Sequence, residues 1–235
     1  MIRFSALLRS LCLAFGVTPI QAGERPIVVE LFTSEGCSSC PPADLLLAEL
    51  ASRPDVLALS YHVDYWDRLG WKDPFSSPEA TERQDRYSTL LHLATVYTPQ
   101  IVVDGKWQAV GSDRADVEHA LDLARRDRRE VSVSLALDHG QAQIKLGPGD
   151  GAVSASVLLI GFERHHVSAV ERGENRGRTL AHVDVVRGVE EIARYSGTAA
   201  TIAAPIPWNC DRVAGLLQAA DGRVLGVAVS DAEPL

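Results

Sequence analysis

Two hydrophobic patterns run along the chain, and the change between them falls near residue 130. From residue 26 to about 129, short continuous apolar runs alternate with longer segments whose apolar residues recur at helical spacing. From residue 130 onward, apolar and polar residues alternate over short runs separated by turns rich in glycine and aspartate. The first pattern is typical of buried strands alternating with helices, and the second of half-buried antiparallel strands. Because no low-complexity linker separates the two regions, we expect them to pack together.

The first region predicts an α/β unit in the order strand, helix, strand, helix, strand, strand, helix. Ser77 before Pro78 is typical of an N-cap followed by proline at the first helical position, and Asp104-Gly105 is typical of a hairpin turn. The predicted elements are strands at 27–32, 56–63, 100–103 and 106–110, and helices at about 37–50, 78–93 and 114–126.

The second region predicts a β-rich unit. The predicted strands are 131–137, 142–146, 154–162, 179–186, 198–203, 213–218 and 224–229. Their spacing is typical of a β-sandwich, a module that binds, docks or shields. His165 and His166 are neighbours on one of these segments, and because adjacent strand residues point to opposite faces, we do not expect them to chelate one metal ion together.

The first 22 residues predict a signal peptide. Arg3 and Arg9 form its positive end, residues 11–17 its apolar centre, and Ile20-Gln21-Ala22 a cleavage triplet. The apolar stretch is shorter than the ~20 residues that a membrane-spanning helix needs, and no later segment is long enough. We therefore expect a periplasmic or secreted protein that is not inserted in a membrane after cleavage.

Composition and charge narrow the class of partner. The chain has 235 residues, of which 46% are hydrophobic and 23% charged, as expected of a globular protein. The formal charge is -8, and loss of Arg3 and Arg9 with the signal peptide makes it -10. This charge argues against nucleic acid or an anionic membrane as the main partner. Loss of Cys12 with the same segment leaves three cysteines, which predicts one pair and one spare thiol.

Cys37 and Cys40 form a Cys-x-x-Cys pair at the predicted start of a helix. A helix N-terminus stabilises a thiolate, so Cys37 is expected to attack a substrate, and Cys40, one turn further on, to resolve the mixed disulfide. This chemistry needs no cofactor, and its substrates are protein thiols or disulfides. The sequence therefore predicts an exported thiol-disulfide oxidoreductase.

The predicted element order, with Cys-x-x-Cys opening the first helix and Thr98-Pro99 directly before the third strand, resembles the thioredoxin superfamily over about residues 26–129. The resemblance implies that the Thr98-Pro99 bond is cis, at a cost of about 0.5 to 1 kcal/mol in an unstrained chain. It also implies that Pro99 lies beside the cysteine pair and that the main chain of Thr98 holds a substrate strand. The expected catalytic residues are therefore Cys37, Cys40 and Pro99, with Thr98 in substrate binding.

A longer set of motifs resembles one secreted bacterial family, catalogued as domain of unknown function 1223. The motifs are Leu31 to Asp44, His62 to Asp67, Tyr97 to Gln100, Gly173 to His182 and Val185-Val186-Arg187. This resemblance implies an α/β thioredoxin-like domain, residues 23–129, followed by a β-rich, sandwich-like domain, residues 130–235, packed on the first. It supplies no substrate.

Two alternatives to redox chemistry remain open for the cysteine pair. The pair is compatible with a static disulfide in a non-catalytic binding module. It is also compatible with a metal-delivery protein in which Cys37, Cys40 and His62 gather around Cu(I), a metal that favours thiolates. A structural zinc site would need further ligands that the chain does not supply at suitable spacing. We assign no metal ligand.

Three other features have two readings each. Cys210 is either a buried thiol acting as a small hydrophobe or a third thiol that reaches Cys37. The aromatic segment 64–75 either covers the core, which we expect, or forms an apolar platform for unfolded substrate. A glycine-flanked loop is either an ordinary charged hairpin tip or a device that recognises a carboxylate or closes over the cysteine pair. The charged and polar residues of this loop are Glu174, Asn175, Arg176 and Arg178.

Overall fold

The computed structural model describes residues 25–127, 131–150 and 154–231. The predicted signal peptide, residues 1–22, lies outside the described residues. The helices are α1 (Pro41–Ala51), the short 3-10 helix η1 (Asp67–Leu69), α2 (Pro78–Leu90) and α3 (Arg114–Arg126). The strands are β1 (Ile27–Thr33), β2 (Val56–His62), β3 (Gln100–Val103), β4 (Trp107–Val110), β5 (Val133–Asp138), β6 (Gln141–Leu146), β7 (Ala155–Ala169), β8 (Thr179–Tyr195), β9 (Ala200–Pro205), β10 (Arg212–Ala219) and β11 (Val224–Asp231).

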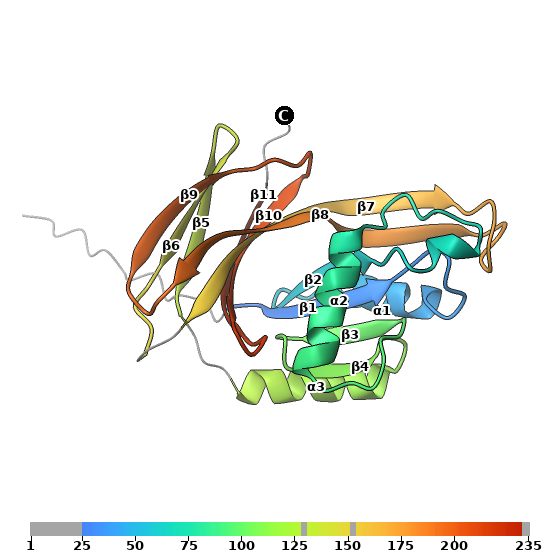
Figure 1. Ribbon diagram of the computed structural model, residues 1–235, viewed down its shortest axis with the longest axis horizontal. Coiled ribbons are helices and arrows are strands. Elements are labelled where there is room, and N and C mark those ends of the chain that lie inside the picture. Colours follow the sequence, from blue (N-terminus) through green and yellow to red (C-terminus); the bar gives the residue numbers. More distant parts are fainter. Residues whose placement is uncertain (1–24, 128–130, 151–153, 232–235) are drawn as a thin grey trace, which may run out of the picture.

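Eight of these strands form one mixed sheet in the order β11-β10-β7-β8-β2-β1-β3-β4 (Figure 1). β1 and β2 are parallel, β1 and β3 are antiparallel, and β8 joins β2 in parallel at the pair Ser60 and Val185. The remaining strands form a second sheet in the order β5-β6-β9. Strands from both halves of the chain therefore share the large sheet.

This architecture corrects the predicted fold class. An α/β thioredoxin-like domain followed by a separate β-rich, sandwich-like region is wrong, because the described residues are mostly β, with 45% in strands, 20% in helices and a large mixed sheet. The physical reason is that β8 pairs with the edge of β2 at Val185 and Ser60, so the second region extends the sheet of the first. The division into domains at residue 129 remains a prediction.

Local signals for the first region are confirmed. Ser77 caps α2, since its hydroxyl accepts a hydrogen bond of 3.1 Å from the amide of Ala80. The Asp104-Gly105 turn joins β3 and β4 with φ angles of 47° and 68°, the left-handed values that a tight hairpin turn needs. Gly105 also has no room for a side chain, because a Cβ there would lie 1.8 Å from the main-chain oxygen of Gly222.

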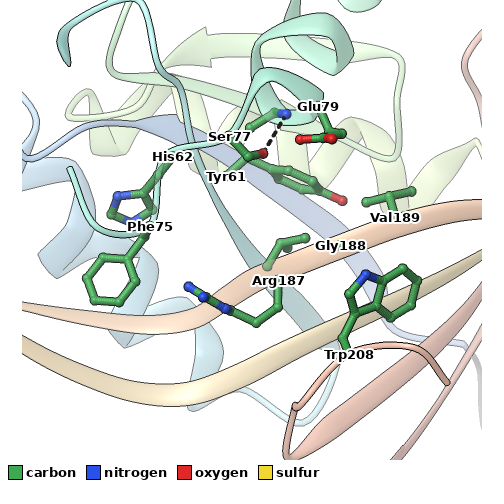
Figure 2. A pocket seen from close by; sticks show the side chains of 11 residues that line it. Tyr61, His62, Phe75, Ser77, Glu79, Arg187, Gly188, Val189 and Trp208 are labelled. Carbon is green, nitrogen blue, oxygen red and sulfur yellow. Dashed lines mark hydrogen bonds between the residues drawn. The ribbon is translucent and has the colours of Figure 1, made fainter. Parts of the chain in front are cut away.

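A cavity of about 160 Å³ lies where α2, the end of β2 and the middle of β8 meet (Figure 2). Tyr61, His62 and Phe75 line one part of it, and Arg187 and Trp208 line another. None of the described helices is both long and apolar enough to cross a membrane.

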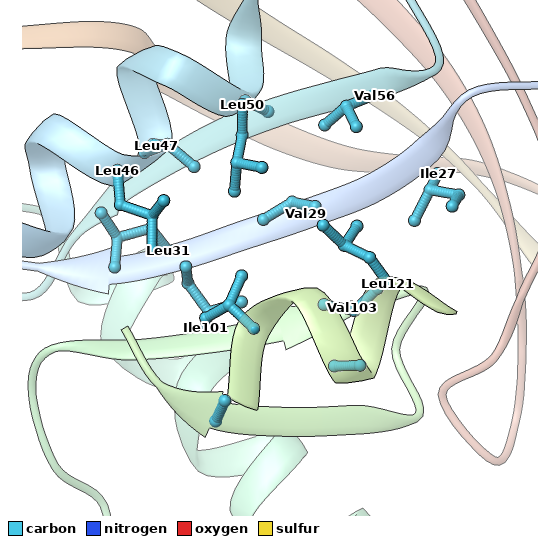
Figure 3. Packing of buried hydrophobic residues seen from close by; sticks show 14 of the residues in the cluster. Ile27, Val29, Leu31, Leu46, Leu47, Leu50, Val56, Ile101, Val103 and Leu121 are labelled. Atoms are coloured by element: carbon cyan, nitrogen blue, oxygen red, sulfur yellow. The ribbon is translucent and has the colours of Figure 1, made fainter. Parts of the chain in front are cut away.

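α1 and α3 pack on one face of the large sheet through a cluster of buried aliphatic side chains (Figure 3). β1 contributes Ile27, Val29 and Leu31, whose alternation places all three on the same face. α1 contributes Leu46, Leu47 and Leu50, which lie on one side of the helix. This packing fixes the start of α1, and with it the cysteine pair, against the end of β1.

α2 covers the opposite face of the sheet. Glu30 on β1 is fully buried there and accepts a hydrogen bond of 2.5 Å from Nε of Arg83 on α2. The hydroxyl of Tyr87 donates to the same carboxylate. Removing one partner of such a buried pair would leave the other charge buried alone and strongly destabilise the protein. The pair therefore fixes α2 against β1.

Candidate functional site

Cys37 and Cys40 form a disulfide at the N-terminus of α1, with their Cα atoms 5.5 Å apart. Cys40 is the N-cap residue, and Pro41 and Pro42 occupy the first turn, where a proline lacks only an amide that the helix would leave unpaired. Both cysteines are 0% exposed, although Ser38 and Ser39 between them are exposed. The predicted pairing is confirmed, and the sulfurs are covered.

The predicted cis bond between Thr98 and Pro99 is present. The indole Nε1 of Trp66 donates a hydrogen bond of 2.8 Å to Oγ1 of Thr98. The same tryptophan packs on Gly36, where a Cβ would lie 3.1 Å from Cβ of Trp66. Trp66 therefore connects the segment before Pro99 to the residue that precedes Cys37.

Glu35, two residues before Cys37, collects hydrogen bonds from three other segments although it is fully buried. Nε1 of Trp71 donates to its Oε2 at 2.8 Å, Nε2 of His182 lies 3.2 Å from its Oε1, and the hydroxyl of Ser168 donates to Oε1. Burial alone would raise the pKa of Glu35, but the hydrogen bonds from His182 and Ser168 hold the pKa below its ordinary value. The carboxylate is therefore ionised and joins the aromatic segment to β7 and β8.

Residues 35–40, which precede α1 and contain both cysteines, are called the cysteine loop below. Asp73 is a second buried hydrogen-bond acceptor beside this loop. Its Oδ2 accepts from the amide of Glu35 at 2.8 Å and lies 2.7 Å from Nδ1 of His62, and its Oδ1 accepts from the amide of Phe75 at 2.9 Å. Burial would raise the pKa of Asp73, but His62 and these hydrogen bonds lower it below the ordinary value. Asp73 thus holds the main chain just before the cysteines.

Asp44 lies one helical turn after Cys40 on α1, with its amide hydrogen-bonded to the carbonyl of Cys40 at 3.1 Å. Its side chain is 8% exposed and accepts a hydrogen bond of 2.9 Å from Oγ1 of Thr33. Burial raises the pKa of Asp44 to about 6, against the opposing effects of His182 and Thr33. Carboxyl groups with pKa values shifted in opposite directions therefore lie together behind the disulfide, a pattern found at acid-base sites.

Residues 170–178, between β7 and β8, are the glycine-flanked loop of the sequence analysis, and we call them the hairpin tip. The hairpin tip contacts the cysteine loop, so the reading of this segment as an ordinary solvated turn is wrong. The side-chain amide of Asn175 donates to the carbonyls of Glu35 and Cys37 at 2.9 and 2.8 Å. Oε2 of Glu174 accepts from the amide of Ser38 at 3.1 Å. All three contacts are to the main chain of the cysteine loop.

The aromatic segment belongs largely to the protein's own packing. Tyr65 and Trp66 are partly buried against the core, and Trp71 is fixed by its hydrogen bond to Glu35. Trp71 also contacts the hairpin tip, since a Cβ on Gly173 would lie 3.2 Å from Cβ of Trp71. Leu69 is the exception, with 49% of its surface exposed. The expectation that this segment covers the core is confirmed for Tyr65 and Trp66.

His62, the third residue of the copper alternative, lies at the end of β2, and its ring centroid is 4.7 Å from that of His182. Its Nδ1 is occupied by Asp73. Within residues 25–127, 131–150 and 154–231, no three His, Cys, Asp or Glu side chains are grouped so as to hold a metal ion.

Cys210 is a free, buried thiol that the structure does not bring to the cysteine pair. It lies against β7, where a Cβ on Gly161 would be 3.1 Å from its Sγ. Ser168, which contacts Glu35, is seven residues further along the same strand, or about 23 Å at the rise of a strand residue. Burial raises the pKa of the Cys210 thiol. The buried, small-hydrophobe reading fits this position.

The sequence analysis named Asn175 in a loop with two readings, but it missed the other polar residues that surround the disulfide. Glu35, Asp73 and His182 come from three segments, and none of them stands out by spacing. One signal was available, because Glu35 and Asp44 lie within two and four residues of a cysteine, in segments otherwise rich in apolar residues. Buried carboxyl groups so close to a thiol pair are candidates for an acid-base role.

One family model and one solved structure match most of the chain. The family described as "Protein of unknown function (DUF1223)" matches residues 28–219. The crystal structure of protein AGR_C_4864 from Agrobacterium tumefaciens is similar over 88% of this chain and 95% of that chain, with 34% sequence identity and a TM-score of 0.77. A crystal structure of oxidised superoxide reductase matches 46% of this chain and 90% of that chain, but at 8% identity and a TM-score of 0.23 it carries no argument. None of the curated proteins matches.

Proposed function

Since the chain belongs to the DUF1223 family of proteins of unknown function, its activity has to be inferred from the site, and we propose that it is an exported thiol-disulfide oxidoreductase. Its substrates in this proposal are protein thiols or disulfides. The observation that carries the proposal is the disulfide at the first turn of α1 with the buried carboxyl of Asp44 one turn behind it. A static disulfide has no need of an acid whose pKa is close to neutral.

The proposed reaction starts from the disulfide. A partner thiolate attacks Sγ of Cys37, a bond forms between the two sulfurs, the Cys37–Cys40 bond breaks, and Cys40 leaves as a thiolate that takes up a proton. The second thiolate of the partner then attacks the partner sulfur that is bonded to Cys37. A disulfide forms within the partner, and Cys37 is released as a thiolate. Two electrons and two protons pass from the partner dithiol to the cysteine pair, and the reverse sequence oxidises a partner.

The neighbouring residues have distinct parts in this proposal. Cys37 exchanges with the partner, because the amides at the N-terminus of α1 favour its thiolate. Asp44 is the acid-base group for Cys40, since it lies on the next helical turn with a pKa of about 6. Pro99 and Thr98 hold the partner segment beside the sulfurs, the role that their position at the start of β3 suggests.

Replacing Cys40 by serine is expected to trap the reaction at its first stage. The variant Cys40→Ser keeps the attacking thiol but lacks the resolving one, so it should accumulate a covalent complex with a partner protein that a reductant releases. Cys37→Ser is the matched control and should trap at least tenfold less. The measurement is non-reducing electrophoresis and intact mass of protein purified from the periplasm.

The redox potential of the Cys37–Cys40 pair tests the same proposal without a partner. Exchange activity requires a potential above about -300 mV, because structural disulfides of exported proteins lie below that value. A lower potential together with no trapped complex in Cys40→Ser would contradict the proposal. That result would instead support a binding module with a locked disulfide, which the burial of both cysteines favours.

A further inference from the structure

The hairpin tip is hydrogen-bonded to the main chain around a buried disulfide. Exchange requires a sulfur atom to approach the S–S bond, yet both cysteines are 0% exposed. Among the described residues of the second half of the chain, the hairpin tip is the segment that is hydrogen-bonded to the main chain of the cysteine loop. Figure 1 shows the long β7 and β8 hairpin extending from the small β5-β6-β9 sheet to the loops beside α1. Opening of this contact would therefore precede reaction.

Asn175 is inserted into the cysteine loop, whereas its neighbours are not. It is 1% exposed, although residues 171–174 and 176–178 are all exposed. Its amide nitrogen bridges the carbonyls of Glu35 and Cys37, and its Oδ1 accepts a hydrogen bond of 2.9 Å from Arg178. Arg178 thus orients the amide so that its donors face the cysteine loop. One buried side chain on an otherwise exposed turn is a small contact to break.

The backbone of the hairpin tip is suited to hold this insertion. Gly173 and Gly177 flank the segment with φ angles of 75° and 80°, values that favour glycine. Main-chain hydrogen bonds close the turn, with the amide of Gly177 donating to the carbonyl of Val170 at 2.7 Å. The hairpin tip is therefore a preformed unit that can leave or return without refolding.

The groups that the hairpin tip occupies are those that a peptide would use. Asn175 supplies amide N–H donors to two carbonyls, and Glu174 supplies an oxygen acceptor to the amide of Ser38. An extended polypeptide carries the same donors and acceptors as a regular array in its main chain, whereas a small thiol such as dithiothreitol has hydroxyl groups but no such array. A polypeptide can therefore replace the hairpin tip as it reaches the disulfide.

We propose that the hairpin tip is a displaceable cover, held by Asn175 and Glu174, and that an extended polypeptide bearing a thiol takes over its contacts with Glu35, Cys37 and Ser38. This inference rests on the proposed oxidoreductase function for its biological meaning. It assigns Asn175 a positioning role that selects polypeptide thiols over small ones. The cover itself is a property of the folded protein whether or not exchange is its function.

The first test is the rate at which dithiothreitol reduces the Cys37–Cys40 disulfide, with dithiothreitol oxidised to its cyclic disulfide. Asn175→Ala removes two hydrogen bonds from the closed state, so the disulfide should be reduced at least tenfold faster. Arg176→Ala is the matched control, because the side chain of Arg176 makes no hydrogen bond or ion pair with the residues that the structure describes, and its rate should stay within twofold of the parent. Thiol alkylation followed by mass measurement gives the rate.

A second variant protects this test against misfolding. Glu174 is exposed, so Glu174→Ala is not expected to affect folding, and it should accelerate reduction about threefold by removing the acceptor for Ser38. Urea unfolding midpoints establish which variants are folded. If the unfolding midpoint of Asn175→Ala matches that of the parent, the reduction rate of Asn175→Ala is the test; if it does not, the reduction rate of Glu174→Ala is the test. A reduction rate within twofold of the parent in the variant used as the test overturns the cover.

The class of partner is tested by a ratio of rates. Reduced, unfolded ribonuclease A should react with the parent protein at least tenfold faster per thiolate than dithiothreitol does. Asn175→Ala should lower this ratio at least threefold, since the small thiol gains more from an open site. If the ratio is the same in both proteins, the hairpin tip does not select polypeptides. A loss of stability alone would change both rates and leave their ratio unchanged.

Failure of the cover and failure of the proposed function give different results. Unchanged reduction rates together with a trapped complex in Cys40→Ser would overturn the cover and leave the oxidoreductase proposal standing. Faster reduction in Asn175→Ala, with no trapped complex in Cys40→Ser and a potential of the parent pair in the range of structural disulfides, would support the cover and overturn the oxidoreductase proposal.

Discussion

Replacing Glu35 by alanine is expected to lower the free energy of unfolding by about 3 to 5 kcal/mol. The substitution removes a buried carboxylate that accepts hydrogen bonds from Trp71, Ser168 and His182, and leaves the buried His182 and the half-buried Trp71 and Ser168 without this partner. Hydrogen bonds to charged groups contribute about 1.5 to 3 kcal/mol each, and removal of one member of a buried charged network costs about 3 to 5 kcal/mol. Urea unfolding at pH 7 measures the loss.

Two control variants separate this effect from the loss of any glutamate. Glu49 is exposed and pairs with exposed Arg114, so Glu49→Ala should cost less than about 1 kcal/mol. Glu35→Gln keeps the shape of the side chain and one acceptor oxygen, and should fall between the two. A cost for Glu35→Ala no larger than that for Glu49→Ala would show that the carboxylate does not hold β7 and β8 to the cysteine loop.

Replacing Asp44 by asparagine is expected to remove a destabilising effect that grows with pH. The pKa of Asp44 is about 6 in the folded protein and 3.8 in its unperturbed form, so the unfolded chain loses this proton first as the pH rises. Ionised Asp44 therefore costs stability that is absent below pH 3.8 and complete above pH 6. The difference of about two pKa units corresponds to about 3 kcal/mol.

The measurement for Asp44→Asn is the free energy of unfolding of both proteins at pH 4 and pH 7.5. The variant should gain about 2.5 kcal/mol relative to the parent between these two values. Glu35 and Asp73, whose pKa values are lowered, act in the opposite direction, but both proteins retain them. A difference that is the same at both pH values, or that grows toward low pH, would mean that the folded protein does not raise the pKa of Asp44.

Local sequence signals predicted the parts of the site that are adjacent along the chain. The cysteine spacing predicted a pair at a helix start, and the resemblance carried by the element order and Thr98-Pro99 implied the cis bond; both are present. Each of these signals acts within a few residues, where backbone geometry is decided. The Asp104-Gly105 turn between β3 and β4 belongs to the same class.

Long-range pairing was beyond these signals. Nothing in the alternating pattern of β8 specifies β2 as its neighbour, because any half-buried strand presents the same main-chain groups. β7 and β8 also extend beyond the predicted 154–162 and 179–186, to Ala169 and Tyr195. More than half of their additional residues are polar and all but one are exposed or half-buried, so they lack the apolar character by which a strand is recognised.

The polar network beside the disulfide depends on that same long-range pairing. Asn175 and His182 become buried only because β7 and β8 extend past β2 to the cysteine loop. In the sequence both residues resemble ordinary surface side chains, and only tertiary packing gives them a buried carboxylate or carbonyl as partner. The cysteine pair was therefore predictable, whereas closure of the loop over it was one of two readings between which the sequence did not decide.

The pairing of β8 with β2 has a consequence for biosynthesis. β2 is complete at residue 62, but its neighbour on that edge, β8, begins only at residue 179. While the intervening residues are still being made, this edge of an apolar strand has no partner, and an open edge is a template for pairing with other chains. We therefore expect nascent chains to depend on a chaperone until translation has passed β8.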